Sequence, residues 1–369
     1  MSEGAAAPTM GRNIVVCLDG TGNEVKARGV SNVVKLVELL DLDDPLKQVA
    51  YYDPGVGTSA AASAWSPAAR ALSRSGGLLI GNGMRQNLGQ AYSFLMNSWR
   101  PGSKIYVFGF SRGAYTARAL AGMLYRIGLL RSGSENLVPY AVSVYARRRG
   151  WQFERRANEG FDRMDAFSQA LAQATRKGSR AVPIEFMGLW DTVKAANVLG
   201  RDLKWPYTRQ LPNVDAVRHA VSIDEKRRPY REYLLEPKDA GARPDLNETW
   251  FAGVHSDIGG SFDDDHQLGD LTLKWISEGA IVSGLLVKDQ TVQRRLAVSP
   301  GTALGTIHRM SRLWAVATFR TRQLPENARV HSSVRHRISA DPDYARRIPP
   351  GVSWEDPTWD APVKPRPPT

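Results

Sequence analysis

Short apolar segments alternate along the chain with longer segments in which apolar residues recur at helical spacing. The short segments are rich in β-branched and aromatic residues and stop at turn-forming residues, which is typical of buried strands. We expect strands at 13–18, 48–52, 105–110, 182–189 and 249–254, and helices at 32–40, 84–99 and 268–287. Alternation of this kind predicts an α/β fold, with a mostly parallel central sheet flanked by helices.

The domain organisation follows from where this alternation starts, is interrupted and fades. We expect a flexible N-terminal tail over residues 1–11, a single α/β-hydrolase-like domain over 12–345 and a Pro-rich C-terminal tail over 346–369. Residues 135–180 are rich in arginine and in helix-forming residues, and are interpreted as a helical cap insertion. Arginine pairs beside large apolar side chains at 151–167 suggest a lipid-facing lid suited to an anionic membrane surface. A cap helix that packs on the body of the domain fits the same pattern.

Charge and composition narrow the choice of partner and location. The net charge of +12 suits an anionic surface, either lipid or nucleic acid, and a solvated basic surface with no specific partner fits it as well. Basic residues are scattered and no nucleic-acid-binding motif occurs, so we expect no nucleic-acid partner. Cys17 is the single cysteine, which excludes a disulfide within the chain. No signal peptide or membrane-spanning run is evident, and we expect a cytoplasmic location. The sequence does not indicate an oligomeric state.

The strongest local motif is Gly109-Phe110-Ser111-Arg112-Gly113, a G-x-S-x-G pattern. It lies between a strand-like run and a helix-like run, where a sharp turn would expose the Ser111 hydroxyl at the top of the sheet. Glycine at 109 and 113 avoids collisions in such a turn. We therefore expect Ser111 to be a nucleophile, the alternative being a tight turn with a capping serine.

Two further strands end beside residues that would complete a catalytic triad. Asp191 follows the fourth expected strand, and His255 follows the fifth. The order Ser111, Asp191, His255 is that of α/β-hydrolase triads, in which imidazole takes the serine proton and a carboxylate orients the imidazole. Asp191 could instead cap a helix, with Asp257 or residues 263–265 as the acid. The other histidines lack a preceding apolar strand and a following Gly-Gly turn: His219, His266, His308, His331 and His336.

An oxyanion hole needs two backbone donors, and two places in the sequence can supply them. Arg112 follows the nucleophile, and Gly20 or Thr21 in the loop after the first strand would give the second N–H. Asp19 begins that loop, and its Asp-Gly-Thr sequence also occurs in phosphatases of the haloacid dehalogenase type. Those enzymes carry a nucleophilic aspartate where this chain has Cys17, so we reject that alternative. We expect Asp19, Gly109, Gly113 and Asp257 to support the loops of the site.

The sequence carries no pattern for a metal or cofactor. A Walker motif, a complete dinucleotide fingerprint and a His/Cys cluster with zinc spacing are all missing. We therefore expect neither a metal nor a cofactor.

Five motifs in fixed order resemble the α/β-hydrolase family known as domain of unknown function 2235. The family includes phospholipase effectors of bacterial type VI secretion of the G-x-S-x-G class. The resemblance runs from residue 13 to at least 275, and the motifs are LDGTGN, GFSRGAYTAR, GLWDTV, SIDEKRRPY and WFAGVHSDIGGSF. It implies Ser111 as nucleophile, Asp191 as acid and His255 as base in the metal-free hydrolysis of a fatty acyl ester, typically of a phospholipid.

We therefore expect a serine ester hydrolase of the phospholipase A or lipase type, acting through an acyl-enzyme. Two alternatives are a carboxylesterase for a soluble small ester and a non-catalytic lipid- or protein-binding member of the fold. The resemblance also raises non-classical export as an effector.

Overall fold

The structure is a computed structural model of the whole chain. It describes residues 11–20, 29–55, 77–146, 155–175, 179–194, 205–236, 245–309 and 320–363. The expected N-terminal tail falls outside these ranges apart from Gly11, and so does Thr21.

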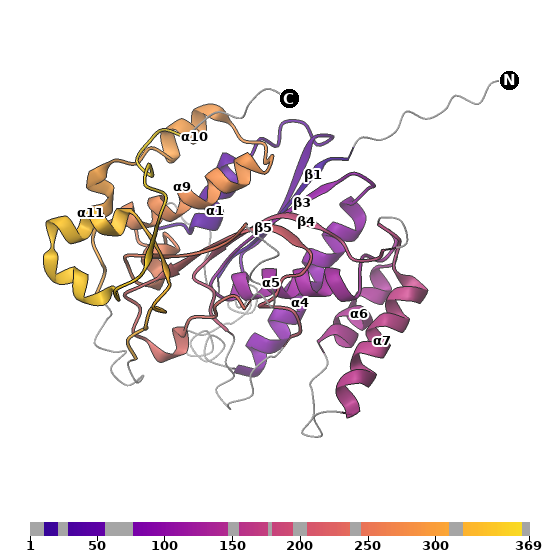
Figure 1. Cartoon of the computed structure of the whole chain (residues 1–369). Coiled ribbons are helices and arrows are strands. Elements are labelled where there is room, and N and C mark those ends of the chain that lie inside the picture. Colours follow the sequence, from indigo (N-terminus) through magenta and orange to yellow (C-terminus); the bar gives the residue numbers. More distant parts are fainter. Residues whose placement is uncertain are drawn as a thin grey trace, which may run out of the picture.

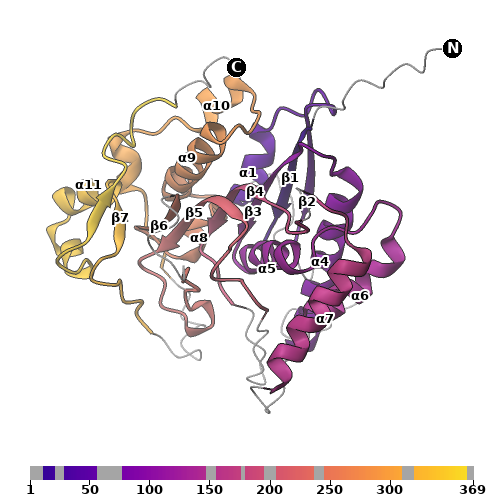
Figure 2. The ribbon, with the colours of Figure 1, turned by 45° about the vertical axis from the view of Figure 1, so that its right-hand side comes forward.

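One parallel sheet forms the centre of the described part of the chain (Figures 1 and 2). The strand order across the sheet is β2-β1-β3-β4-β5-β6-β7-β8, and each neighbouring pair is parallel. The strands are β1 (Asn13–Leu18), β2 (Gln48–Asp53), β3 (Lys104–Phe110), β4 (Ile184–Trp190), β5 (Val214–Ser222), β6 (Leu246–Phe251), β7 (Arg329–His331) and β8 (Ser353–Glu355). Since parallel strands end at one edge, loops that follow them are brought together there.

Helices cover both faces of the sheet, which confirms the expected fold class (Figure 1). One face carries α4 (Gly77–Ser98) and α5 (Arg112–Arg126), with α6 (Val138–Tyr145) and α7 (Arg155–Leu171) packed beside them. The other face carries α1 (Asn32–Leu39), α9 (Gln267–Val282) and α10 (Asp289–Arg295). The shorter α8 (His255–Ile258) follows β6, and α11 (Ser333–Ala340) packs near β7.

The alternation of side chains along β1 shows how one strand serves two cores. Ile14, Val16 and Leu18 belong to the core formed with α4 and α5. Val15 and Cys17 belong to the core formed with α1 and α9. All five are buried, because a strand with helices on both faces has no solvent-facing side.

The helices described within the expected cap insertion are η1 (Glu135–Leu137), α6 and α7, and the apolar side of α7 faces the domain. Met164 and Phe167 on α7 are buried in the core that α4 and α5 share, and Phe161 packs against it. For these three side chains, packing on the body replaces exposure to lipid. The arginines that motivated a lid lie in residues 147–156, whose side chains are outside the described part. Within that part, no helix combines the length and apolar character needed to cross a bilayer.

Strands β5, β7 and β8 were not expected from the sequence. The centre of β5 reads Arg218-His219, which interrupts the apolar pattern, and each side chain has a buried or half-buried polar partner. The described portion of the expected C-terminal tail, up to residue 363, contains β8 and the buried Trp359, which packs with Leu268 and Leu271. The proline content of that segment predicted irregular structure. Trp354 and Trp359 nevertheless pack against apolar side chains of the domain.

Candidate active site

Ser111 occupies a sharp turn between β3 and α5. Its backbone is strained, with φ 58° and ψ −121°, a region that a residue with a Cβ seldom adopts. A Cβ at Gly109 would lie 2.7 Å from Ala114 Cα, and one at Gly113 would lie 2.2 Å from the Leu18 carbonyl oxygen. Only glycine fits on either side, so the flanking glycines are a steric requirement of this turn.

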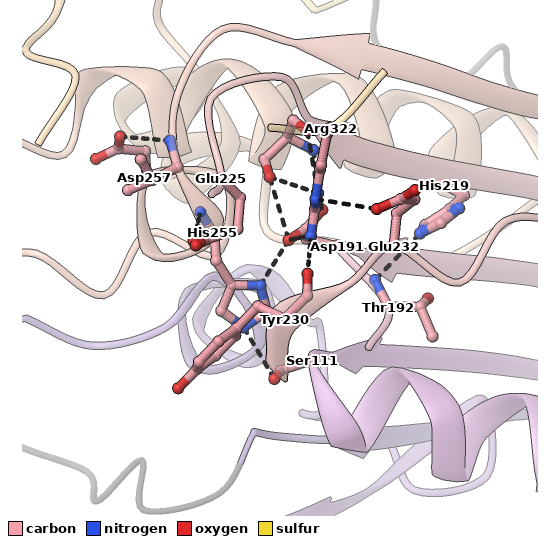
Figure 3. A network of polar contacts seen from close by, with 12 residues as sticks. Ser111, Asp191, Thr192, His219, Glu225, Tyr230, Glu232, His255, Asp257 and Arg322 are labelled. Carbon is pink, nitrogen blue, oxygen red and sulfur yellow. Dashed lines mark hydrogen bonds and ion pairs between the residues drawn. The ribbon is translucent and has the colours of Figure 1, made fainter. Parts of the chain in front are cut away.

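The side chains of Ser111, His255 and Asp191 form one hydrogen-bonded chain (Figure 3). The Ser111 hydroxyl lies 2.9 Å from His255 Nε2, and His255 Nδ1 lies 2.6 Å from Asp191 Oδ2. The three residues follow β3, β6 and β4, so the sheet edge brings together positions that are far apart in sequence. Asp191 also has a positive φ of 38°, which turns the chain sharply at the end of β4.

The His255 ring is fixed on several sides. Phe110 stacks on it and Tyr230 meets it in a T-shaped contact, each with ring centroids 4.8 Å apart. Glu225 Oε2 accepts the backbone N–H of His255 at 3.2 Å. Burial lowers the pKa of His255 below its ordinary value, although the hydrogen bond to Asp191 opposes that shift. The imidazole is therefore neutral near pH 7, with Nδ1–H donating to Asp191 and Nε2 free to accept the Ser111 proton.

Asp191 is fully buried and held as a carboxylate by donors on several sides. Arg322 donates from Nη1 to Oδ1 at 2.6 Å and from Nη2 to Oδ2 at 3.0 Å. The Ser222 N–H donates to Oδ1 at 2.9 Å. Burial raises the pKa of Asp191, but Arg322 and His255 outweigh it and hold that pKa well below the usual value. The charge that orients His255 thus depends on a guanidinium group.

Acidic residues of the SIDEKRRPY motif hold the backbone on both sides of the turn that carries His255. Asp224 Oδ2 accepts the Gly253 N–H at 2.8 Å and the Tyr344 hydroxyl at 2.6 Å, which fixes the turn between β6 and α8. Glu225 binds Arg227 through both carboxylate oxygens, at 2.9 and 2.8 Å. The sequence identified this motif by resemblance only, and its contacts give each acidic residue a structural task.

Two of the residues expected to form the oxyanion hole, Arg112 and Gly20, lie in the described part of the chain, whereas Thr21 lies outside it. Arg112 is the first residue of α5, so its backbone N–H has no acceptor within the helix. Asp19 follows β1 and accepts hydrogen bonds from the Ser31 hydroxyl and, at 3.0 Å, from the Tyr52 hydroxyl. The Gly20 N–H donates to Asp19 Oδ1 at 2.6 Å, so that donor is engaged locally.

Two of the alternative residues, Asp257 and His219, have partners of their own. Asp257 accepts the Val254 N–H at 2.8 Å and pairs with His308 at 2.5 Å, which supports the turn that carries His255. His219 pairs with Glu248 at 2.8 Å, inside the sheet.

Sequence reasoning missed Arg322. It comes from an irregular segment with no strand or turn signal, so its position beside Asp191 emerges only from the fold. Ser222 was missed for a similar reason, because it ends the unexpected strand β5.

The chain is similar in sequence to a curated protein of yeast. A curated relative, an uncharacterized protein of Saccharomyces cerevisiae, is 36% identical over 234 residues, which cover 62% of this chain. The chain spans 33% of that relative's length.

Two solved structures resemble the chain at low sequence identity. A crystal structure of an uncharacterized protein from Pseudomonas aeruginosa matches with a TM-score of 0.42 and 17% identity, covering 80% of this chain and 50% of that one. A Tle1 effector bound to the VgrG spike of the type VI secretion system matches with a TM-score of 0.32 and 20% identity, covering 69% of this chain and 51% of that one.

The family assignment depends on a direct match over most of the chain. Residues 12–279 match the model described as the catalytic domain of Tle1-like phospholipase effectors of type VI secretion. Ser111, Asp191 and His255 fall inside this range, whereas Arg322 falls outside it. The match agrees with the resemblance seen in the sequence motifs, and the chain belongs to the family of Tle1-like phospholipase effector catalytic domains, which are phospholipase-type hydrolases.

Proposed function

We propose that the protein is a serine ester hydrolase that cleaves fatty acyl esters of phospholipids. The observation that carries this proposal is the continuous hydrogen-bonded chain from the Ser111 hydroxyl through His255 to the buried Asp191 carboxylate. Family membership supports the phospholipid as substrate class. The strained turn at Ser111 supports the nucleophilic role, because it holds the hydroxyl at the edge where the strands end.

In the acylation half-reaction, Ser111 Oγ attacks the ester carbonyl carbon while its proton passes to His255 Nε2. Asp191 stabilises the imidazolium that forms, since its pKa is held low and it remains charged. The tetrahedral intermediate collapses when the bond to the leaving alcohol breaks and His255 returns the proton to that alcohol. An acyl-enzyme remains, linked through Ser111 Oγ.

In the deacylation half-reaction, water takes the place of the alcohol. His255 accepts a proton from the water, whose oxygen attacks the acyl carbon, and the collapse returns the proton to Ser111. We assign one oxyanion donor to the Arg112 N–H and the second to the loop that follows β1. Since Gly20 donates to Asp19, Thr21 remains the candidate of that loop.

A lipid panel tests the proposal. Wild-type protein, Ser111→Ala and a control, Ser132→Ala, are incubated with short-chain phosphatidyl lipids and with a soluble ester, p-nitrophenyl butyrate, and released acid is measured. Ser132 is an exposed serine that hydrogen-bonds Asn97. We expect fatty acid release by the wild type and the control, and a loss of about a thousandfold or more in Ser111→Ala.

Each other outcome selects an alternative. Hydrolysis of the soluble ester without the phospholipids would indicate a carboxylesterase. A folded wild-type protein that hydrolyses neither would indicate a lipid- or protein-binding member of the family.

A further inference from the structure

The turn after β4 that carries Asp191 is joined to the turn that carries the nucleophile. Asp191 has a positive φ of 38°, which a residue other than glycine seldom adopts, so contacts with the surroundings must hold this turn. The Asp191 N–H donates to the Ala220 carbonyl at 2.8 Å, and the Val193 N–H donates to the Ser111 carbonyl at 3.4 Å. The backbone that positions the acid is therefore hydrogen-bonded to the backbone that positions the nucleophile.

Between these two bonds, the Thr192 N–H depends on a side chain. It donates to His219 Nε2 at 3.2 Å (Figure 3). His219 lies on β5, in register with Leu189 of β4, and both His219 and Thr192 are buried. A buried backbone N–H needs an acceptor, and a ring nitrogen supplies it here. The imidazole thus fixes the middle of the turn from the neighbouring strand.

The partners of the His219 ring determine where its proton lies. Since a backbone N–H can only donate, Nε2 must be the unprotonated nitrogen. Nδ1 therefore carries the proton and donates to Glu248 Oε2 at 2.8 Å. Glu248 is in register with His219 on β6 and also accepts the Leu235 N–H at 2.8 Å, which keeps the carboxylate in place. The ring is thereby held at both nitrogens.

The surroundings of His219 favour the neutral ring that can accept a hydrogen bond at Nε2. Arg118 on α5 is fully buried, and its Nη2 lies 3.2 Å from His219 Nδ1. Burial lowers the pKa of His219 and the guanidinium adds to that shift, although Glu248 and Asp191 oppose it. His219 therefore remains an acceptor for the Thr192 N–H at neutral pH.

We propose that His219 is a positioning residue of the triad, which fixes the Asp191 carboxylate through the backbone of the turn; the inference rests on the proposed function. Arg322 binds the carboxylate itself, whereas His219 acts on the chain that carries it. Without this acceptor the carboxylate moves relative to His255, and the imidazolium that forms during acylation loses part of its stabilisation. The loss falls on the chemical step, so kcat falls while KM changes little.

Substitutions at His219 in the full chain separate its two hydrogen bonds. His219→Phe keeps a buried ring but removes both nitrogens. His219→Gln carries an amide that reaches the position of Nε2 and can accept from Thr192, whereas the shorter side chain of His219→Asn reaches the position of Nδ1 and can only donate to Glu248. The control is His331→Phe, which removes another buried histidine, on β7, where its partners are Ser333 and Asp356. Circular dichroism and urea unfolding establish that each variant is folded in the assay.

Turnover is measured with p-nitrophenyl butyrate and with dihexanoylphosphatidylglycerol. We expect kcat of His219→Phe and His219→Asn to fall about tenfold or more, with KM within about twofold, because a misplaced catalytic group weakens stabilisation of the transition state. His219→Gln should recover most of the lost kcat. His331→Phe should lose stability and keep the kcat of the wild type.

The pH profile separates positioning from a loss of stability. Burial lowers the pKa of His255 and Arg322 adds to that shift, whereas the carboxylates of Asp191 and Glu225 oppose it. Of these groups, Asp191 is the one carried by the turn that His219 holds. The acid limb of kcat/KM should therefore move to lower pH in His219→Phe and stay in place in the control.

A folded His219→Phe variant with the kcat and the acid limb of the wild type would overturn the proposal, and so would an equal loss of kcat in the control. Should His219→Phe fail to fold, His219→Asn decides, and wild-type kcat in that variant would overturn the proposal. Failure of the proposed hydrolase function is recognised separately, as a wild-type protein that hydrolyses neither substrate or as turnover that survives Ser111→Ala, and the inference about His219 fails with it.

Discussion

Replacing Arg322 by methionine removes the guanidinium that holds Asp191 while keeping an unbranched apolar stem at this position. Arg322 is buried, and its two hydrogen bonds to Asp191 measure 2.6 and 3.0 Å. In the variant, Asp191 keeps the Ser222 N–H and the His255 ring as donors. A fully buried carboxylate is then left with no guanidinium beside it (Figure 3).

The magnitude follows from burial. Removing one partner of a buried ion pair costs about 3–5 kcal/mol, because the other charge stays desolvated. The pKa of Asp191 is depressed in the folded wild type, so its carboxylate stabilises the fold at every pH above the ordinary aspartate pKa of about 3.9. This stabilisation is lost as the pH falls through the pKa that Asp191 has in the folded state. Without Arg322, burial dominates and raises that pKa. The stability deficit of Arg322→Met should therefore be largest at neutral pH and shrink on acidification.

The assay combines urea unfolding, followed by circular dichroism, with kcat/KM on p-nitrophenyl butyrate across pH. We expect the unfolding free energy at neutral pH to fall by about 3–5 kcal/mol. We also expect the acid limb of kcat/KM to move to higher pH, because a protonated Asp191 no longer orients His255. Arg322→Lys, which keeps the charge without the paired donors, should lie between, and Arg294→Gln, which removes an exposed arginine from α10, should match the wild type. A methionine variant within about 1 kcal/mol of the wild type, with its acid limb unmoved, would refute the reasoning.

Two further predictions concern the turn and the base. Gly113→Ala should lower the unfolding free energy by about 2 kcal/mol or more in urea titration, because its Cβ would lie 2.2 Å from the Leu18 carbonyl oxygen; a neutral substitution would mean that the turn relaxes easily. Burial lowers the pKa of His255 while Asp191 and Glu225 raise it, so the acid limb of wild-type kcat/KM should lie below about pH 6.5. Glu225→Gln should move that limb to still lower pH, and an upward shift would contradict the assigned electrostatics.

The parts of the fold that the sequence predicted are those with a continuous apolar pattern. Strands β1 to β4 and β6 have such patterns, and the residues that follow three of them meet at one edge of the sheet. Their meeting needs no knowledge of the intervening chain, because parallel strands deliver their carboxyl ends to the same place.

The unpredicted parts depend on partners that no local pattern encodes. Strand β5 carries His219 and Arg218 in its interior, and these are compensated by Glu248 and by the Trp275 carbonyl, each distant in sequence. Arg322 reaches Asp191 across 131 positions. Long-range polar pairs of this kind determine the electrostatics of the site. The catalytic candidates themselves could be predicted, because each lies just after a strand with an apolar pattern.

The most direct test of the account is covalent labelling of Ser111. The wild-type protein is treated with a fluorophosphonate probe, and the modified residue is mapped by peptide mass spectrometry. We expect a single phosphonylated site at Ser111, strong suppression of labelling in His255→Ala and none in a folded Ser111→Ala variant. A folded wild-type protein that remains unlabelled, or carries the label at another serine, would contradict the assignment of Ser111 as the nucleophile.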